Sequence, residues 1–403
     1  MKVLHIQTGM TPAGNAAYRL HQAMRREGIE SYVLTYQKTI KRNFVFNEKT
    51  GLKQIIAKFY NKIINTKIIN KKKAGTYLFS VFPRITFNEI IQHAKNMDVI
   101  YLHWISGGYL SVKDISKLAQ LGKPIIFFMH DMWTMTGGCH HSFDCTQYKT
   151  GCKECEMFQS RGNIAFKQNK IKANLFRKYN NLYFVSPSQW MANCAKESSI
   201  LKEKPVYVIP NIVDESIFKP LDKGISRNIL NLPHNKFIIT FGCQAGINNK
   251  FKGFDYLREA INNLNFSDIQ LLIYGSDYNQ RTVEQLKYPI IFLGPINDEH
   301  VLSLICNASD LFVSPSLAES FGLTFLENTL CGTPVIGFDC TAIPEIVKTG
   351  INGYLTKNKN SEDLSQGITL IYNKKITMKE TIKYNSSAII KQHKELIKNI
   401  LEK

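Results

Sequence analysis

Two glutamates eight positions apart, Glu319 and Glu327, could bind a ligand that carries hydroxyl groups at both of its ends. An apolar run that predicts a strand ends shortly before Glu319, which therefore stands in a loop. A helix is predicted to open from this loop, and Glu327 stands about two turns into it. Phe321, Gly322 and Leu323 stand at the helix start, where N–H groups lack partners within the helix and suit an anion such as a phosphate. The stretch therefore suits a sugar nucleotide, whose diphosphate lies between two hydroxylated ends.

Either glutamate alone is more simply explained as a solvated surface charge, because glutamates are mostly exposed. The full string is harder to explain in this way. It resembles the Glu-x7-Glu signature of retaining glycosyltransferases of family four, and the resemblance extends from the amino terminus to about residue 355. This resemblance implies an α/β protein of the GT-B fold, in which two Rossmann-like domains face a cleft. It also implies a C-terminal helix that crosses back onto the first domain.

The length of the chain predicts two domains, since 403 residues are many for one hydrophobic core. We place an acceptor-side Rossmann-like domain at 1–205, a nucleotide-sugar-binding Rossmann-like domain at 206–385 and the final helix at 386–403. No apolar run reaches the roughly 18 residues that a membrane span needs, and the first residues predict a strand and not a signal peptide. We therefore expect a cytoplasmic protein.

The net charge of +19 is concentrated in one segment. Residues 38–73 hold eleven lysines or arginines against one acid, and apolar residues recur between them at helical spacing. A basic amphipathic helix is typical of attachment to an anionic membrane surface, as in a peripheral membrane protein. The alternative is a surface helix whose apolar stripe packs on its own domain. No nucleic acid partner is expected, because the chain has no helix-turn-helix pattern or aromatic RNA-binding signature.

Two loops of the amino-terminal half could contact a ligand. Gly14 lies in the loop after the first predicted strand, at the carboxyl end where open α/β sheets bind ligands. The resemblance places this loop near the donor phosphates or the acceptor. His130 ends a later apolar strand, and a lone histidine there is more often structural. The resemblance nevertheless implies that His130 is catalytic together with Glu319, contacting the donor sugar and steadying the reacting groups. His103 is a second candidate of the same kind.

Four of the nine cysteines fall within an insert at 136–158 and end in a Cys-x2-Cys pair: Cys139, Cys145, Cys152 and Cys155. Their spacing is compatible with a structural zinc site closed by four thiolates, although it differs from the commonest paired zinc knuckles. Reduced, metal-free cysteines are the alternative. An odd number of cysteines without a secretion signal argues against a disulfide framework. The insert is similar to one in a subgroup of family-four enzymes of exopolysaccharide or colanic-acid-type synthesis, where it would shape the acceptor side of the cleft.

The carboxyl-terminal half carries the residues that would bind the donor. Asn211 belongs to a segment similar to the one that joins the two domains in the family, with Ile212 where glycine is usual and where isoleucine would resist a positive φ. Lys252 matches the family's lysine for the donor diphosphate. The family's arginine has no counterpart between Thr240 and Lys252, and Lys250 would replace it with a point charge in place of a bidentate fork.

The expected reaction is retaining transfer of a hexosyl-type group from a nucleotide-diphosphate sugar to a glycan acceptor. A lipid-linked acceptor fits the basic segment and a role in surface polysaccharide biosynthesis. Charge builds on the departing diphosphate, so Lys252 and the N–H groups of the helix start would stabilise it. Glu319 would hold sugar hydroxyls and Glu327 the ribose. No Asp-x-Asp signature for a divalent metal is present, and the resemblance implies that catalysis needs no cofactor.

Two other functions stay open. A sugar-nucleotide epimerase of the GT-B type would keep the fold but need no acceptor. A non-catalytic protein that binds nucleotides or polyanions would show nucleotide affinity without turnover, or binding that weakens strongly with salt.

Overall fold

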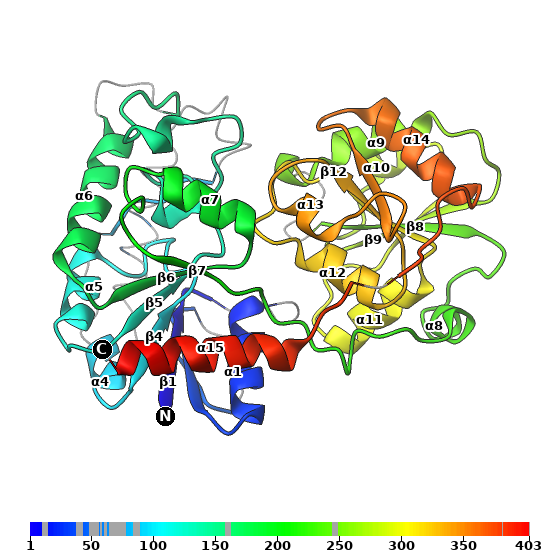
Figure 1. The fold of residues 1–403 in the computed structure, drawn as a ribbon. Coiled ribbons are helices and arrows are strands. Elements are labelled where there is room, and N and C mark those ends of the chain that lie inside the picture. The colour runs from blue at the N-terminus through cyan, green and yellow to red at the C-terminus, as the bar shows by residue number, and fades with distance from the viewer. Residues whose placement is uncertain are drawn as a thin grey trace. The chain divides into compact units, whose positions relative to one another are not determined.

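The computed structural model describes residues 1–9, 15–37, 43–47, 56, 59, 63, 78–83, 89–157, 163–243, 249–380 and 382–402, arranged in two compact units (Figure 1). The first unit contains Asn15–Ile212, the first strand and the chain from Ser387 onward, and the second contains Val213–Ser386. The chain thus passes from one unit to the other after Ile212 and after Ser386. The sequence analysis placed these two boundaries after residues 205 and 385.

The first unit is built on a seven-stranded parallel sheet in the order β3-β2-β1-β4-β5-β6-β7. Its strands are near-continuous apolar runs, as expected where helices cover both faces of a parallel sheet. The order reverses between β1 and β4, the kind of position where such sheets bind ligands. The strands are β1 (Lys2–Gln7), β2 (Glu30–Thr35), β3 (Val45–Asn47), β4 (Val99–Leu102), β5 (Ile125–Phe128), β6 (Leu182–Ser186) and β7 (Val206–Val208).

Four helices of this unit begin at a side chain that accepts a hydrogen bond from the first turn. Asn15 accepts from the N–H of Tyr18, and Ser111 forms a capping box with Asp114. The helices are α1 (Ala16–Arg26), α4 (Glu89–Ala94), α5 (Val112–Ala119), α6 (Ile164–Lys178) and α7 (Gln189–Glu197), with short 3₁₀ turns η2 (Met132–Thr134) and η3 (Gln147–Lys149).

The C-terminal helix α15 (Ser386–Leu401) packs on the first unit, as the sequence predicted (Figure 1, red). His393 is fully buried, and its Nδ1 lies 3.1 Å from the hydroxyl of Tyr101 in β4. Lys394 donates to the carboxylate of Glu27 at 2.8 Å. The final helix therefore joins the core of a domain whose contacting residues lie 292 and 367 residues earlier in the chain.

The second unit repeats the same architecture with a six-stranded parallel sheet in the order β10-β9-β8-β11-β12-β13. Its strands are β8 (Phe237–Gly242), β9 (Ile269–Tyr274), β10 (Ile290–Phe292), β11 (Leu311–Ser314), β12 (Val335–Phe338) and β13 (Gly353–Thr356). Its helices are α8 (Lys223–Ile229), α9 (Phe254–Asn262), α10 (Gln280–Glu284), α11 (Glu299–Ala308), α12 (Leu323–Leu330), α13 (Ile343–Ile346) and α14 (Ser361–Tyr372), with a 3₁₀ turn η4 (Lys250–Lys252). Two apolar clusters form its core.

The prediction of an α/β protein with two Rossmann-like domains is therefore confirmed. The predicted basic amphipathic helix within 38–73 lies almost wholly outside the described residues. Across the residues that the structure does describe, no helix has both the length and the apolar character needed to cross a bilayer.

Candidate functional site

The loop between β11 and α12 holds the first glutamate at the start of a helix that no side chain caps. Gly322 is the N-cap residue of α12 and has a left-handed backbone with φ of 92°. A Cβ at this position would lie 3.1 Å from the ring of Phe325, so both the backbone and the space favour glycine. The N-terminus of α12 is thus left to backbone N–H groups, which can hold an anion.

Lys252 and Glu319, which the sequence analysis proposed separately, meet as an ion pair. Lys252 Nζ lies 2.7 Å from Glu319 Oε1, and the two side chains are 17% and 15% exposed. The pair is therefore largely shielded from water, where opposite charges attract more strongly than on an exposed surface. Glu319 is not the solvated surface charge of the simpler explanation, because its carboxylate lies against a cation.

The η4 turn brings Lys252 to this position because it packs directly on the glutamate loop. Gly253 ends the turn with φ of 69°, and a Cβ there would meet the carbonyl oxygen of Pro315 at 1.9 Å. The N–H of Leu317 also donates to the carbonyl of Phe251 at 3.0 Å. Glycine is therefore required at 253 both for its conformation and for the close approach of two backbones.

A third loop, after β12, fixes the backbone of Glu319. The N–H of Glu319 donates to Thr341 Oγ1 at 2.9 Å, and the N–H of Ala342 donates to the carbonyl of Glu319 at 3.2 Å. Thr341 has a positive φ of 54°, which is uncommon for a β-branched residue. Sequence reasoning missed Thr341, because nothing in its local pattern signals this contact.

Glu327 lies in the interior of the second unit, with only 2% of its surface exposed. It lies close enough to Tyr274, at the end of β9, to affect that phenol. Burial first, and then the acidic groups of Cys306 and Glu327, raise the pKa of Tyr274 well above its usual range. Among the described residues, the Tyr274 hydroxyl has no hydrogen-bond partner. Tyr274 was not a sequence candidate, yet it places a neutral hydroxyl beside the second glutamate.

Phe321 and Leu323 contribute their side chains to the core, since both are partly buried against the apolar cluster under α12. Any contact they make with a ligand would therefore come from their backbone. Asn211 is buried just before the boundary between the units. Ile212 is also buried and does not adopt a positive φ, as expected of a branched residue. Gly14 lies outside the described residues.

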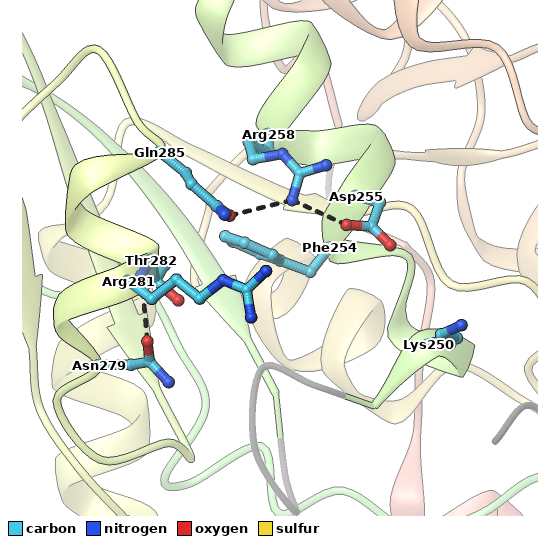
Figure 2. Close-up of a pocket in the computed structure, with 8 residues that line it drawn as sticks. All are labelled: Lys250, Phe254, Asp255, Arg258, Asn279, Arg281, Thr282 and Gln285. Carbon is cyan, nitrogen blue, oxygen red and sulfur yellow. Dashed lines mark hydrogen bonds and ion pairs between the residues drawn. The ribbon is translucent and has the colours of Figure 1, made fainter.

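Lys250 lies in a different environment from Lys252. It lines a pocket of about 360 Å³ between α9 and α10 (Figure 2). Arg258 in this pocket pairs with Asp255 at 2.9 Å and donates to Gln285 at 3.2 Å. Arg281 of α10 and Phe254 of α9 line the same pocket. The pocket is lined by Lys250, Phe254, Asp255, Arg258, Asn279, Arg281, Thr282 and Gln285.

The two guanidinium groups of this pocket thus come from α9 and α10, and not from the segment between Thr240 and Lys252. The pocket carries three cations against one carboxylate, which suits an anionic group. Sequence reasoning looked for an arginine only between Thr240 and Lys252. Arg281 lies beyond that window, at the start of a helix that gave no separate signal.

His130 and His103, the two histidine candidates of the first unit, are in contact. His130 Nε2 lies 2.7 Å from His103 Nδ1, and the rings are stacked with centroids 5.0 Å apart. The ring of His130 also stacks on Phe128 at 4.7 Å. Burial lowers the pKa of His130 to about 4, against a smaller opposing effect of Asp131. His130 is therefore neutral at physiological pH.

The four clustered cysteines differ in exposure: Cys152 is buried, Cys139 and Cys155 are half-buried, and Cys145 is exposed. Burial, and then the neighbouring thiols, raise the pKa of Cys139 well above its usual value. The ammonium of buried Lys172 lies nearby, and burial lowers the pKa of Lys172 to about 7. Within the described part of the chain, which includes all nine cysteines, no cysteine forms a disulfide bond. The same part of the chain contains no group of three or more His, Cys, Asp or Glu side chains arranged to hold a metal. This arrangement gives the predicted zinc site no support, and the site stays a prediction.

Comparison with known families gives two matches that together span most of the chain. Residues 13–217 match the family model described as Glycosyltransferase Family 4, and residues 222–388 match the model described as Glycosyl transferases group 1. The boundary between the two matches falls close to the boundary between the two structural units.

Curated relatives are similar over part of their length. An uncharacterised 41.2 kDa protein of the cps region of Klebsiella pneumoniae is 27% identical over 46% of this chain and 50% of its own. D-inositol 3-phosphate glycosyltransferase 1 of Catenulispora acidiphila is 30% identical over 41% of this chain and 44% of its own. The putative colanic acid biosynthesis glycosyl transferase WcaC of Escherichia coli is 25% identical over 48% of this chain and 50% of its own. The chain thus spans about half the length of these relatives.

Solved structures are similar over the whole chain. HepE of Anabaena, solved in complex with UDP and glucose, has a TM-score of 0.67 at 19% sequence identity. The match covers 99% of this chain and 100% of the HepE chain. Sucrose-phosphate synthase of Thermosynechococcus elongatus has a TM-score of 0.70 at 16% sequence identity. The match covers 100% of this chain and 99% of the synthase chain. At these identities the likeness shows the fold, and it confirms the predicted GT-B class.

Proposed function

Because this chain belongs to glycosyltransferase family 4, we propose that it transfers a sugar from a nucleotide-diphosphate donor to a glycan acceptor with retention of configuration. The observation that carries the proposal is the ion pair of Lys252 and Glu319, 2.7 Å long, beside the uncapped N-terminus of α12. This arrangement puts a cation, a carboxylate and backbone N–H donors within one loop cluster of the second unit.

We assign separate tasks in the proposed reaction to the groups of this cluster, to Glu327 and to His130 of the first unit. Lys252 and the N–H groups at the start of α12 stabilise the negative charge that develops on the departing diphosphate. Glu319 accepts hydrogen bonds from hydroxyls of the transferred sugar, while Glu327 accepts from the ribose. His130, neutral at physiological pH, hydrogen-bonds the transferred sugar. No residue of the cluster is assigned as a covalent nucleophile.

The pairing of Lys252 with Glu319 has a consequence for donor binding. The ammonium of Lys252 is paired with the carboxylate of Glu319. A diphosphate that arrives beside both groups draws on the same ammonium, and the sugar hydroxyls then satisfy the carboxylate in its place. On donor binding, Lys252 would therefore pair with the diphosphate and Glu319 with the sugar hydroxyls. The binding of the sugar and the binding of the diphosphate are thus coupled through this one ion pair.

We also propose that the acceptor is a lipid-linked saccharide of surface polysaccharide biosynthesis, used at the inner, cytoplasmic face of the membrane. The names of two relatives, from a cps region and from colanic acid biosynthesis, support this acceptor class. The basic segment 38–73 supports a membrane partner, and its described residues Ile56 and Phe59 are helical and 48% and 64% exposed. A structural zinc bound by the four clustered cysteines is kept as a proposal, because binding would offset the mutual repulsion of their thiolates.

Calorimetric titration of UDP, GDP and ADP into the full chain and into Glu327→Gln tests the donor site. We expect micromolar binding of one diphosphate and an affinity at least tenfold lower for the variant, because an amide is a poorer acceptor for the ribose hydroxyls than a carboxylate. The matched control is Glu345→Gln, at an exposed position on the short helix α13, for which we expect no change. Equal binding by the wild-type chain and Glu327→Gln would remove Glu327 from the donor site.

A further inference from the structure

The pocket between α9 and α10 in the second unit holds positive charge that its own side chains do not neutralise (Figure 2). Its described lining has one carboxylate, that of Asp255, against three cations: Lys250, Arg258 and Arg281. Arg258 pairs with Asp255 at 2.9 Å. Among the described residues, the ammonium of Lys250 and the guanidinium of Arg281 have no hydrogen-bond or ion-pair partner. An anion in the pocket would therefore meet two cations that no described protein group neutralises.

The carboxylate of Asp255 opposes the binding of an anion only weakly. Its side chain is 67% exposed, so water screens its charge, and one of its oxygens already contacts Arg258. Gln285 accepts from the same nitrogen of Arg258, Nη1, at 3.2 Å. The Nε and Nη2 groups of Arg258 have no partner within the part of the chain that the structure describes. They can therefore donate as a fork, the geometry that matches a phosphate.

The neutral part of the lining can bind hydroxyl groups. Thr282 is only 5% exposed, yet its hydroxyl has no hydrogen-bond partner among the described residues. A polar group that is buried without a partner is unfavourable, so a ligand that bonds to it gains affinity. Asn279 accepts from the N–H of Thr282 at 3.0 Å through its side-chain oxygen, which leaves its amide N–H groups as donors. Phe254 adds a buried apolar ring to the same lining.

The size of the pocket limits the ligand. A volume of about 360 Å³ is at the lower end of the range for small-molecule pockets. A compact ligand such as a phosphorylated monosaccharide suits this volume better than an extended nucleotide sugar. Its phosphate would match the cations, and its hydroxyl groups would match Thr282 and Asn279.

We propose that this pocket is a second anion site of the second unit, which binds a phosphate-bearing small molecule of the size of a sugar phosphate. The three cations bind the phosphate, while the hydroxyl of Thr282 and the amide of Asn279 bind hydroxyl groups of the ligand. The site is separate from the proposed donor site, because neither Lys252 nor Glu319 belongs to the described lining of the pocket.

Calorimetric titration of glucose 1-phosphate into the full chain tests the site, with glucose and inorganic sulfate as matched probes. We expect one glucose 1-phosphate to bind per chain, and each matched probe to bind at least tenfold more weakly. Arg281→Gln should weaken the binding of glucose 1-phosphate at least fivefold, because a charge-assisted hydrogen bond is lost. Thr282→Val keeps the shape of the side chain but removes the hydroxyl, and should weaken binding about threefold.

Asp255→Asn should change the affinity in the opposite direction. This substitution removes a carboxylate from the pocket and releases Arg258 from its ion pair, so we expect glucose 1-phosphate to bind at least twofold more tightly. Damage to the fold would not tighten binding. Lys357→Gln controls for the loss of an exposed cation, since Lys357 follows β13, at the opposite edge of the sheet from β10. We expect no change in this control.

The outcomes separate this site from the proposed donor site. Binding of glucose 1-phosphate that persists in Lys252→Met and weakens in Arg281→Gln would support the inference, whether or not the chain transfers a sugar. Binding that is lost in Lys252→Met and unchanged in Arg281→Gln would overturn it, because the ligand would then occupy the donor site. Equal binding of sulfate and glucose 1-phosphate would identify an adventitious ion only and overturn it as well. So would the absence of glucose 1-phosphate binding.

Discussion

Replacing Lys252 with methionine is expected to lower turnover of the nucleotide-sugar donor by about 10²–10³-fold, the usual effect of removing one group that stabilises charge in the transition state. Methionine keeps the length and apolar stem of lysine but removes the ammonium that lies 2.7 Å from Glu319. The affinity for the nucleoside diphosphate should fall as well, because the same ammonium would contact the diphosphate. Steady-state kinetics of nucleoside diphosphate release, together with calorimetric titration, measures both effects.

Lys250→Met is the matched control for this prediction. Lys250 belongs to the same 3₁₀ turn but is exposed and lines the pocket between α9 and α10. We expect its loss to change turnover by less than about tenfold, since an exposed cation contributes little through solvent. Equal losses in Lys250→Met and Lys252→Met would contradict the distinct roles that the two environments indicate.

Replacing Gly253 with alanine is expected to lower the free energy of unfolding by about 2–5 kcal/mol, the sum of a left-handed alanine and an overpacked contact. The added Cβ would lie 1.9 Å from the carbonyl oxygen of Pro315, so η4 must move away from the glutamate loop. This movement would also displace Lys252 from Glu319. Urea unfolding gives the stability, and nucleotide titration gives the loss of the site.

Gly350→Ala separates backbone strain from the clash. Gly350 also lies in the second unit and has a φ of 77°, but a Cβ there would meet nothing within 4 Å. We expect this variant to lose only about 1–2 kcal/mol, the cost of a left-handed alanine, with nucleotide binding unchanged. If the two variants lost the same amount, close packing of η4 on the loop would not explain the glycine at 253.

The fold could be predicted from the sequence because each of its central strands is a short apolar run of consecutive residues. The apolar runs that became β1, β4, β5, β8 and β11 are buried on both faces of parallel sheets, so their composition alone marks them. Helix α12 (Leu323–Leu330) was predicted from the pattern of residues 324–330 and from the Gly-Thr-Pro sequence that ends it. Glu319 and Glu327 followed from the resemblance of the whole string to the Glu-x7-Glu signature.

The parts of the site that the sequence did not predict are contacts between segments far apart in the chain. Thr341 holds Glu319 across 22 residues, and His5 meets His103 across 98. A parallel sheet brings such residues together through strand order, and no local pattern encodes which side chains then meet. The different surroundings of Lys250 and Lys252 could not be predicted for the opposite reason. It is two residues from Lys252, yet the 3₁₀ turn directs the two lysines into different surroundings.

The release of nucleoside diphosphate from a panel of nucleotide sugars, with and without lipid-linked saccharide acceptors, tests the central claim most directly. The full chain should release the diphosphate from one donor, release should be faster with an acceptor, and the new linkage should keep the anomeric configuration of the donor. Release or isomerisation of a donor that no acceptor accelerates would favour an epimerase. Tight nucleotide binding without turnover of any donor would contradict a transferase and identify a binding protein.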